Sequence, residues 1–314
     1  MDPQFICAFC ASFWLRDNAG VAAAYPAKHV AVFEELRRRL FGIAYRMIGT
    51  TADAEDIVQE AYLRWHQANT EEIRSAEAWL VSVVTRLSID KLRKASVERE
   101  KYIGEWLPEP LIASTAPDPE EKLETASNLS MAYMGLLERL TPVERAAFLL
   151  HDVFDCAYPL IANILRKSEA ACRQVVHRAR QRVRSEKSRF KASDAALRTL
   201  INQFMAAADA GDDKTLLSLF AKDATLTSDG GGVVPAARRV VHGRSRIARL
   251  YLLLAKRLGP RLRKEILIIN GEPGLVMYLD GAPLATVSFA SDGASITALY
   301  TVLNPNKLHR LSSK

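Results

Sequence analysis

A basic segment at residues 167–189 constrains the fold of this 314-residue chain more than any other stretch. It reads KSEAACRQVVHRARQRVRSEKSR, and its apolar residues recur at every fourth position, which predicts one apolar stripe along a helix. Ser168 precedes the stripe, where its hydroxyl can accept a hydrogen bond from a first-turn backbone N–H. The arginines lie largely off the stripe. They are Arg173, Arg178, Arg180, Arg182 and Arg184, with Gln174 and His177 among them.

A short apolar segment at residues 158–165, YPLIANIL, comes just before the basic one. Pro159 suits the first turn of a helix, and Arg166 and Lys167 connect the two segments. A short helix, a tight turn and a basic second helix form the helix-turn-helix pattern, whose second helix enters the major groove of DNA. The alternative is a solvated basic helix in an ordinary helical bundle.

The charges are segregated along the chain. The formal net charge of +7 indicates little by itself, but Lys and Arg cluster at residues 37–39, 86–101 and 166–191. Asp and Glu cluster at 53–60 and 118–124. Such segregation predicts different partners on different surfaces. Hydrophobic residues make up 49% of the chain, which excludes wholesale disorder.

Cysteine usage and the leader favour a cytoplasmic protein. Four cysteines in this length form no disulfide framework, and the Cys7/Cys10 pair has no second CxxC or HxxxH to complete a metal site. Residues 5–15 are apolar, but they are too few to span a bilayer and follow no basic residue. We therefore expect neither a signal peptide nor a membrane association.

The chain divides into stretches of different character. Residues 1–27 are a leader that we expect to be flexible, residues 28–101 and 128–190 have helical patterns, and residues 102–127 form a linker with four prolines. Residues 195–310 begin with helical patterns and continue with β-like runs bounded by Asn-Gly and Asp-Gly hairpin signals. Helices followed by an antiparallel sheet predict an α+β domain. The expected fold is multidomain, with two all-α helical domains, the second containing the helix-turn-helix, and a C-terminal α+β domain.

Hydroxyl residues mark several helix starts. We expect Thr51 to cap the helix ADAEDIVQEAYLRWHQ and Ser75 to cap AEAWLVSVVTRLSIDKLRKA. Thr141, Pro142 and Glu144 fit a capping box with proline at the first helical position.

These helical segments resemble the two helical domains of the extracytoplasmic-function RNA polymerase sigma factors. The residues that carry the resemblance are AYRMIGTTADAEDIVQEAYLRW, AEAWLVSVVTRLSIDKLRKA and LTPVERAAFLLHDVF…IANILRKSEAACRQVVHRARQRVR. The resemblance implies a sigma region 2 domain at residues 28–101 and a region 4 domain at residues 128–190. It also implies a protein that directs core RNA polymerase to specific promoters and performs no covalent chemistry itself.

The linker and tail resemble the subgroup that carries a fused C-terminal SnoaL-like cone domain. Its linker motif WLPEP and its tail motifs DGGGK and NPDKL stand here as WLPEPL (106–111), DGGGV (229–233) and NPNKL (304–308). Val233 stands in place of Lys and Asn306 in place of Asp, so each tail motif lacks a charge. Arg166 stands where the helix-turn-helix turn often has Gly.

The resemblance implies two contacts with core RNA polymerase, on the β′ clamp and the β flap. The clamp would be bound by the acidic helix, through complementary charges. The residues expected there are Asp53, Asp56, Gln59 and Glu60. From the residues alone, the alternative is a solvated acidic helix face.

The resemblance also implies promoter DNA as a partner. The helix at residues 76–95 and the loop at 69–74 would hold the minus-ten element, with cationic side chains on the strand backbone. Those cations are Arg86, Lys91, Arg93 and Lys94. The helix that starts at Ser168 would read the minus-thirty-five element through Arg173, Gln174 and His177, while Arg178, Arg180 and Arg182 bind phosphates. Trp79 is expected to pack in the core rather than stack on a base.

In the resembling subgroup, the fused domain regulates the sigma domains in cis through its motifs. Trp106, Leu107 and Leu111 are apolar enough for the linker to dock on the tail. The full set of expected regulatory contact residues is Trp106, Leu107, Pro108, Asp229, Gly230, Gly231, Gly232, Asn304, Pro305, Lys307 and Leu308. A separate anti-sigma factor is then not required.

Two other functions remain open at the level of sequence. The tail could be an active cyclase or isomerase, or a small-ligand sensor, with Asp229 as a general base in a pocket. Alternatively, residues 128–188 alone could act as a sequence-specific repressor, which leaves the acidic helix unexplained. We expect no catalytic residue, metal or cofactor.

Overall fold

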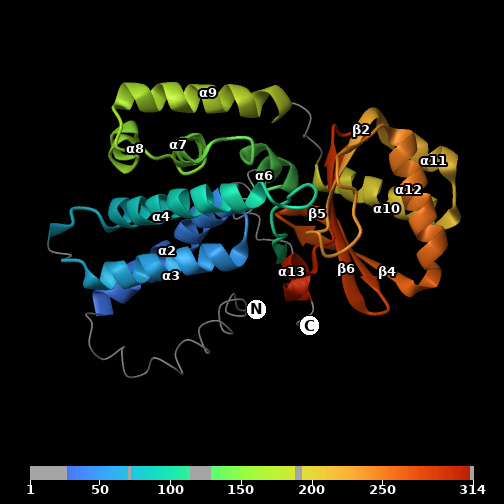
Figure 1. Cartoon of the computed structure of the whole chain (residues 1–314), viewed down its shortest axis with the longest axis horizontal. Helices are drawn as coiled ribbons and strands as arrows, with labels where there is room; N and C mark the ends of the chain where they lie inside the picture. Colours follow the sequence, from blue (N-terminus) through green and yellow to red (C-terminus); the bar gives the residue numbers. More distant parts are fainter. Residues whose placement is uncertain (1–26, 70–71, 114–128, 188–192, 312–314) are drawn as a thin grey trace.

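A computed structural model of the chain describes residues 27–69, 72–113, 129–187 and 193–311 (Figure 1). Two groups of helices lie on one side of the molecule and a sheet domain on the other (Figure 1). Within the described ranges, no helix combines the length and apolar character that crossing a membrane requires. No group of three or more His, Cys, Asp or Glu side chains converges among those residues, and Cys7 and Cys10 lie outside them.

The first helical group consists of α2 (Ala27–Ile48), α3 (Thr51–Gln67) and α4 (Ala76–Arg99). Gly49 ends α2 with φ 84°, a left-handed conformation that glycine adopts without steric cost. The expected cap by Thr51 is wrong. Thr50 holds the N-cap position, and Thr51 is the first helical residue. The Thr51 hydroxyl donates to the linker carboxylate of Glu109. Ser75 caps α4 as expected.

The second helical group consists of α6 (Met131–Leu137), α7 (Pro142–Asp152), α8 (Tyr158–Leu165) and α9 (Glu169–Lys187). Thr141 and Glu144 form the expected capping box of α7. Ser168 Oγ accepts from Ala171 N at 3.2 Å, so it caps α9 as expected. Arg166 closes the turn between α8 and α9 with φ 53° and ψ 49°, so a non-glycine residue adopts the left-handed conformation here.

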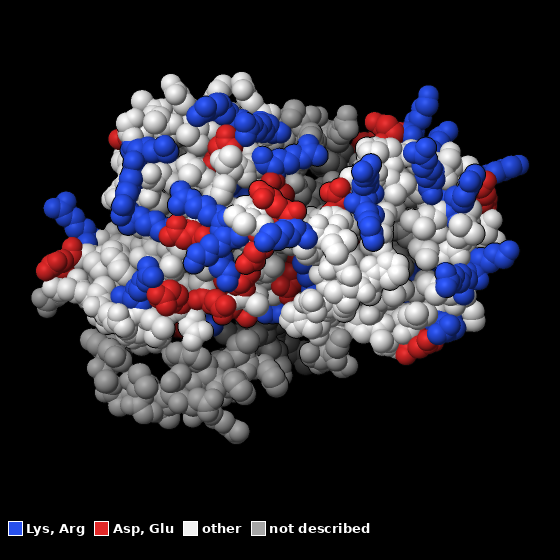
Figure 2. Space-filling view, viewed as in Figure 1, with Lys and Arg blue, Asp and Glu red and all other residues white. Residues whose placement is uncertain are grey.

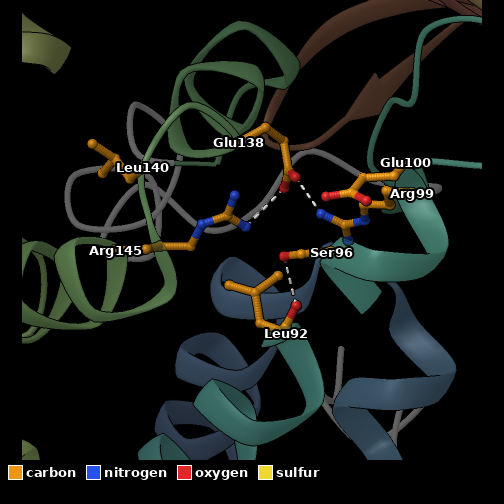
Figure 3. A pocket seen from close by; sticks show the side chains of 7 residues that line it. All are labelled: Leu92, Ser96, Arg99, Glu100, Glu138, Leu140 and Arg145. Carbon is orange, nitrogen blue, oxygen red and sulfur yellow. Dashed lines mark hydrogen bonds and ion pairs between the residues drawn. The ribbon is translucent and has the colours of Figure 1, made fainter. Parts of the chain in front are cut away.

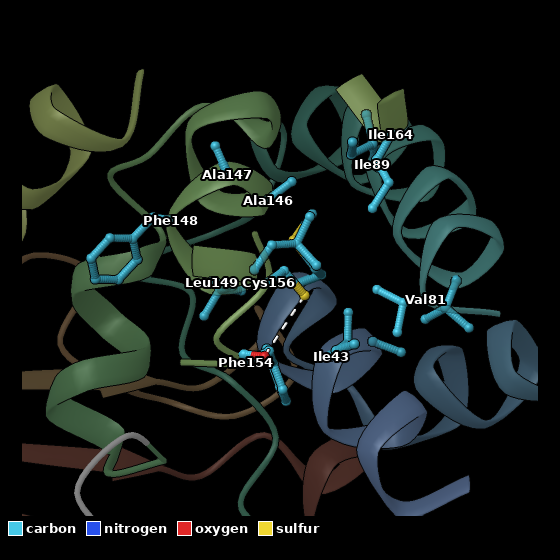
Figure 4. Packing of buried hydrophobic residues seen from close by; sticks show 14 of the residues in the cluster. Ile43, Val81, Ile89, Ala146, Ala147, Phe148, Leu149, Phe154, Cys156 and Ile164 are labelled. Atoms are coloured by element: carbon cyan, nitrogen blue, oxygen red, sulfur yellow. Dashed lines mark hydrogen bonds between the residues drawn. The ribbon is translucent and has the colours of Figure 1, made fainter. Parts of the chain in front are cut away.

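The two helical groups share one hydrophobic core. Buried residues of α2 and α4 belong to the same cluster as buried residues of α7, α8 and α9. Figure 4 shows Ile89 of α4 beside Ile164 of α8, with Ile43 of α2 facing the α7 side of the cluster. The helix-turn-helix and the first helical group therefore pack as one body in this arrangement.

The tail domain combines six strands of a seven-stranded sheet with three longer helices, and the linker supplies the seventh strand. The helices α10 (Asp194–Ala210), α11 (Asp213–Ser218) and α12 (Arg244–Leu258) cover one face of the sheet (Figure 1). The opposite face contacts α6 and α13 (Pro305–Leu308). The sheet therefore lies between its own helices and the helical part of the chain.

The strand order is β1-β4-β5-β6-β7-β2-β3. The strands are β1 (Ile112–Ala113), β2 (Phe220–Asp229), β3 (Val241–His242), β4 (Leu262–Ile269), β5 (Glu272–Leu279), β6 (Ala282–Ser291) and β7 (Ile296–Val302). The short 3-10 helix η5 (Gly259–Arg261) precedes β4, and the short 3-10 helix η6 (His309–Leu311) follows α13.

The sheet is mixed rather than purely antiparallel, because β2 pairs in parallel with β7. The long connection from β2 through α12 and the later strands allows that crossover. The Asn270-Gly271 and Asp280-Gly281 turns have positive φ at both residues, as the hairpin signals predicted.

Candidate interdomain site and nucleic-acid interface

The linker motif lies buried between the helical part and the tail. Leu107, Pro108, Glu109 and Pro110 are all buried. The Trp106 ring lies against Gly49, where a Cβ atom would stand only 2.5 Å from it. The glycine that ends α2 is therefore also the surface on which the linker tryptophan rests.

The Asp229 carboxylate, at the end of β2, holds the linker on the tail. It is 0% exposed. Its Oδ2 accepts from the Leu107 backbone N–H at 2.9 Å and from Lys307 Nζ at 2.7 Å. Its Oδ1 accepts from the Tyr102 hydroxyl at 2.6 Å and from Gly231 N at 3.0 Å. We call this carboxylate and its four donors the docking site.

Lys307 completes the docking site from α13. Its ammonium also donates to the Leu107 carbonyl at 2.5 Å and lies 4.2 Å from the centre of the Trp106 ring. Arg99 stacks on the same ring, with its guanidinium carbon 3.5 Å from the ring centre. Burial lowers the pKa of Lys307, and the opposing attraction of Asp229 does not fully restore it.

The remaining tail motif residues surround these contacts. Gly231 and Gly232 have positive φ, and a Cβ on Gly231 would overlap Asn304. Asn304 Nδ2 donates to the Tyr102 hydroxyl at 3.0 Å, and Leu308 packs with Leu107. Pro305 begins α13, and Gly230 has no room for a side chain beside the Val234 carbonyl.

A second carboxylate, Glu109, binds the linker to the first helical group. It accepts from the Thr51 backbone N–H at 2.8 Å and from the Thr51 hydroxyl. Its own N–H donates to the Gly49 carbonyl at 2.8 Å. Arg310, beyond α13, places its Nε 3.8 Å from the same carboxylate and donates to Glu55 at 2.9 Å. The tail therefore reaches α3 directly.

Asn270 of the β4–β5 turn adds a third connection. Its N–H donates to the Leu111 carbonyl at 2.7 Å, and the Leu111 N–H donates to Asn270 Oδ1 at 3.0 Å. Its amide Nδ2 donates to the Tyr45 hydroxyl at 2.8 Å. Leu111 thus meets the edge of the tail's sheet.

Sequence reasoning missed four of these residues: Tyr102, Glu109, Asn270 and Arg310. Glu109 lies inside the linker motif and Tyr102 lies four positions before it, so the motif was the available signal for both. Asn270 was interpreted only as a turn residue. Nothing in the local sequence of Arg310 marks it, because its partners are more than 200 positions away in the chain.

A cavity of about 300 Å³ lies between the end of α4 and the α6–α7 connection (Figure 3). Within it, Glu138 binds both Arg99 and Arg145, and Arg145 Nη1 also donates to the Met47 carbonyl at 2.8 Å. Figure 3 shows Glu138 between the two guanidinium groups. The residues that line the cavity are Leu92, Ser96, Arg99, Glu100, Glu138, Leu140 and Arg145.

The expected polymerase-binding residues lie along α3. Asp56 and Gln59 are exposed, and Glu60 pairs with Arg64 at 2.8 Å. Asp53 accepts from Lys91 at 2.7 Å and from the Thr50 hydroxyl at 2.5 Å. Burial opposes ionisation of Asp53, but these hydrogen bonds outweigh it and hold its pKa below the usual value. Asp53 is therefore engaged within the chain, in contrast to Asp56 and Gln59.

The expected minus-ten residues lie on α4 and differ in what they contact. Lys94 is exposed, and Arg93 pairs with Asp90 on its own helix at 3.2 Å. Arg86 donates to the Asn163 carbonyl at 3.0 Å and to the Ile164 carbonyl at 3.3 Å, both at the end of α8. The arginine expected to hold one promoter element thus contacts the helix-turn-helix that is expected to read the other.

The expected minus-thirty-five residues follow one side of α9. Gln174, His177 and Arg178 are exposed. Arg173 is also exposed, although it pairs with Glu169 at 3.0 Å.

The two arginines farther along α9 bind acids of α7. Arg180 binds both carboxylate oxygens of Asp152, and Arg182 pairs with Glu144 at 2.8 Å. Arg180 is the more sheltered of the two, and in this arrangement it ties α9 to α7.

Trp79 and Asp229 have partners that fit structural roles. Trp79 packs against Trp65 with ring centres 5.5 Å apart and belongs to the helical core, as expected. Asp229 faces four donors, one of them cationic, instead of a solvent-filled pocket.

Comparison with known proteins agrees with this architecture. Residues 32–97 match the Sigma-70 region 2 family, and residues 130–183 match the Sigma-70 region 4 family. The ECF RNA polymerase sigma factor SigJ of Mycobacterium tuberculosis is 42% identical over 290 residues, which cover 88% of this chain and 92% of the relative. A probable ECF sigma factor of that organism, SigI, is 28% identical over 295 residues, which cover 90% of this chain and 96% of the relative.

The crystal structure of M. tuberculosis SigJ superposes with a TM-score of 0.72 at 38% identity, covering 89% of this chain and 98% of that one. The similarity therefore extends through both helical groups and the tail. The chain belongs to the extracytoplasmic-function RNA polymerase sigma factors of the SigJ type.

Proposed function

We propose that the tail regulates this sigma factor in cis, by holding its two helical domains in a closed arrangement that must open before both promoter elements are read. Core RNA polymerase and promoter DNA are the partners of this family, and promoter-specific initiation is its activity. The observation that carries the proposal is the docking site, where one buried carboxylate joins the linker and the tail.

The geometry of promoters supports an opening step. The minus-ten and minus-thirty-five elements are about 25 base pairs apart, which is more than two helical turns of about 34–36 Å each. Here α4 and α8 are in hydrogen-bond contact through Arg86 and Asn163. Two domains in direct contact cannot each reach a promoter element at that separation. The contact between α4 and α8 must therefore break during promoter binding.

The tail is placed to oppose that opening. It contacts α3 through Arg310, the linker through Asp229 and Lys307, and α2 through Asn270. A covalently attached domain acts at high effective concentration, so each contact needs only modest strength. A separate anti-sigma factor is not required under this proposal.

We also propose that the tail works without catalysis. Asp229, which would be the general base if the tail were an enzyme, has four hydrogen-bond donors, one of them the Lys307 ammonium. A general base needs a substrate proton within hydrogen-bond reach, and these donors occupy that space. We propose that the protein acts in the cytoplasm, together with core RNA polymerase and promoter DNA.

A cross-linking experiment tests the closed arrangement. Arg86→Cys and Asn163→Cys are introduced into a chain that also carries Cys7→Ser and Cys10→Ser. A short bismaleimide then joins the two introduced thiols. We expect the joined protein to lose run-off transcription with core polymerase, because α4 and α8 can no longer separate. The controls are the same chain left unjoined and each chain with only one of the two introduced cysteines treated with the reagent; the native Cys156 and Cys172 are buried. Full transcription by the joined protein would overturn the proposal.

A further inference from the structure

Residues 230–264 of the tail contain ten Lys or Arg residues and no Asp or Glu. Three of the ten bind acids elsewhere in the tail. Arg261 pairs with Asp280, Arg263 pairs with Glu265, and Lys264 pairs with Asp209. The other seven form no ion pair with any residue that the structure describes. They are Arg238, Arg239, Arg244, Arg246, Arg249, Lys256 and Arg257.

Four of these seven lie on the outward side of α12. Ile247, Ala248 and Tyr251 are buried against the sheet, so the opposite side of the helix faces solvent. That side carries Arg246, Arg249, Lys256 and Arg257 around Leu253, which is 59% exposed. We call these five residues the α12 basic face. Figure 2 shows Lys and Arg side chains gathered over α12, on the same side of the molecule as those over α9 and α4.

Helix stability explains only part of the basic charge of α12. Lys256 and Arg257 lie in the last turn, where cations interact favourably with the helix dipole. The first turn contains Arg244 and Arg246, no acid, and no side-chain cap. Cations near a helix N-terminus oppose the helix dipole and destabilise the helix. The neighbouring cations also repel one another, without a described acid to offset them. An unpaired cationic surface of this kind is complementary to a polyanion.

A short connection tethers the tail to α9, the helix that is expected to enter the major groove. Helix α9 ends at Lys187 and α10 starts at Asp194. The connection of a few residues spans at most about 25 Å even when fully extended. Because the recognition helix of a helix-turn-helix lies in the major groove, the start of α10 stays within that distance of the end of the DNA-bound helix, and the tail is tethered beside the duplex.

We propose that the α12 basic face binds the phosphate backbone of promoter duplex DNA next to the minus-thirty-five element. Arg246 and Arg257 are about 16 Å apart along the helix axis, which matches the axial length of about five base pairs. The contact supplies affinity and orientation without reading sequence. It rests on membership of the sigma factor family and is independent of the closed arrangement proposed above.

The salt dependence of promoter binding tests this inference with the complete holoenzyme. Each lost phosphate contact lowers the slope of log K against log salt by about 0.9. We expect Arg246→Ala with Arg249→Ala to lower the slope by about 1.8 on promoter DNA that extends upstream of the minus-thirty-five element. The affinity ratio of wild type to variant then falls about tenfold between 50 and 200 mM salt.

Matched variants separate this role from a general loss of charge. Arg261→Ala with Arg263→Ala removes two equally exposed arginines that already have acidic partners, and the slope should not change. Arg246→Lys with Arg249→Lys keeps the charges and should keep the wild-type slope. On promoter DNA that stops at the minus-thirty-five element, wild type and the alanine variant should bind alike.

Three results would overturn the inference. One is an equal slope change in the Arg261/Arg263 control. Another is an equal loss on the shortened DNA. The third is weaker assembly with core polymerase in the absence of DNA, which would make the α12 basic face a protein contact. A failure of the bismaleimide test would leave all of these outcomes unaffected.

Discussion

At the scale of single residues, the Asp229–Lys307 ion pair supplies each buried charge of the docking site with a partner of opposite charge. Lys307→Met leaves a buried carboxylate without its cationic partner, and such a loss costs about 3–5 kcal/mol. We expect the free energy of unfolding of the full chain in urea to fall by about that amount, and the tail to separate from the linker.

A double-mutant cycle distinguishes loss of the pair from loss of packing. Asp229→Asn removes the charge that Lys307 neutralises, so the double variant should be less destabilised than the sum of the single variants by about 0.5–3 kcal/mol. Additive losses would show that Lys307 acts through its contacts with Trp106 and the Leu107 carbonyl and not through its charge.

At the scale of elements, the end of α2 and the start of the linker depend on the same glycine. Gly49 has φ 84°, and a Cβ there would stand 2.5 Å from the Trp106 ring. Gly49→Ala should therefore combine backbone strain of about 1 kcal/mol with displacement of the ring. Gly211→Ala is the control, because Gly211 has φ 69° and nothing within 4 Å of its added Cβ. If both variants lose equal stability in urea, Trp106 does not depend on Gly49.

Elements whose signals are local were predictable from the sequence, and contacts between distant segments were not. Ser75, Ser168 and the Thr141 capping box mark helix starts through bonds that span three residues. The linker strand β1 has only two residues, and it forms because β4 offers a free edge. The local sequence indicated Thr51 as a cap. It could not indicate the actual partner of Thr51, because Glu109 lies 58 positions away.

The candidate site shows the same division. The motifs placed Asp229, Lys307 and Leu107 in one regulatory set, but only the fold brings Leu107 N within 2.9 Å of a carboxylate 122 positions away. The charge runs predicted which helices are basic or acidic. They could not predict that Lys91 pairs with Asp53, which links a residue expected to bind DNA to one expected to bind polymerase.

At the scale of the whole molecule, the closed arrangement predicts whether truncation of the tail raises or lowers promoter binding. Removing residues 304–314 deletes Lys307 and Arg310 while leaving the sheet and α10–α12 in place. The linker then loses its cationic partners on the tail. Because these contacts stabilise only the closed arrangement, their loss increases the population in which the helical domains are separated. We expect the radius of gyration of the free protein to increase. At matched holoenzyme concentration, promoter binding and run-off transcription should also increase.

Removing the whole tail after Ser193 should differ from the short truncation in one respect. Both variants release the linker, but only the longer one deletes the α12 basic face, so only it should also lose salt-dependent affinity for DNA upstream of the minus-thirty-five element. Parallel salt titrations of the two truncated holoenzymes measure that difference. If the short truncation transcribes less than the full chain while remaining folded, the residues after Leu303 assist promoter binding, and the tail does not hold the sigma domains closed.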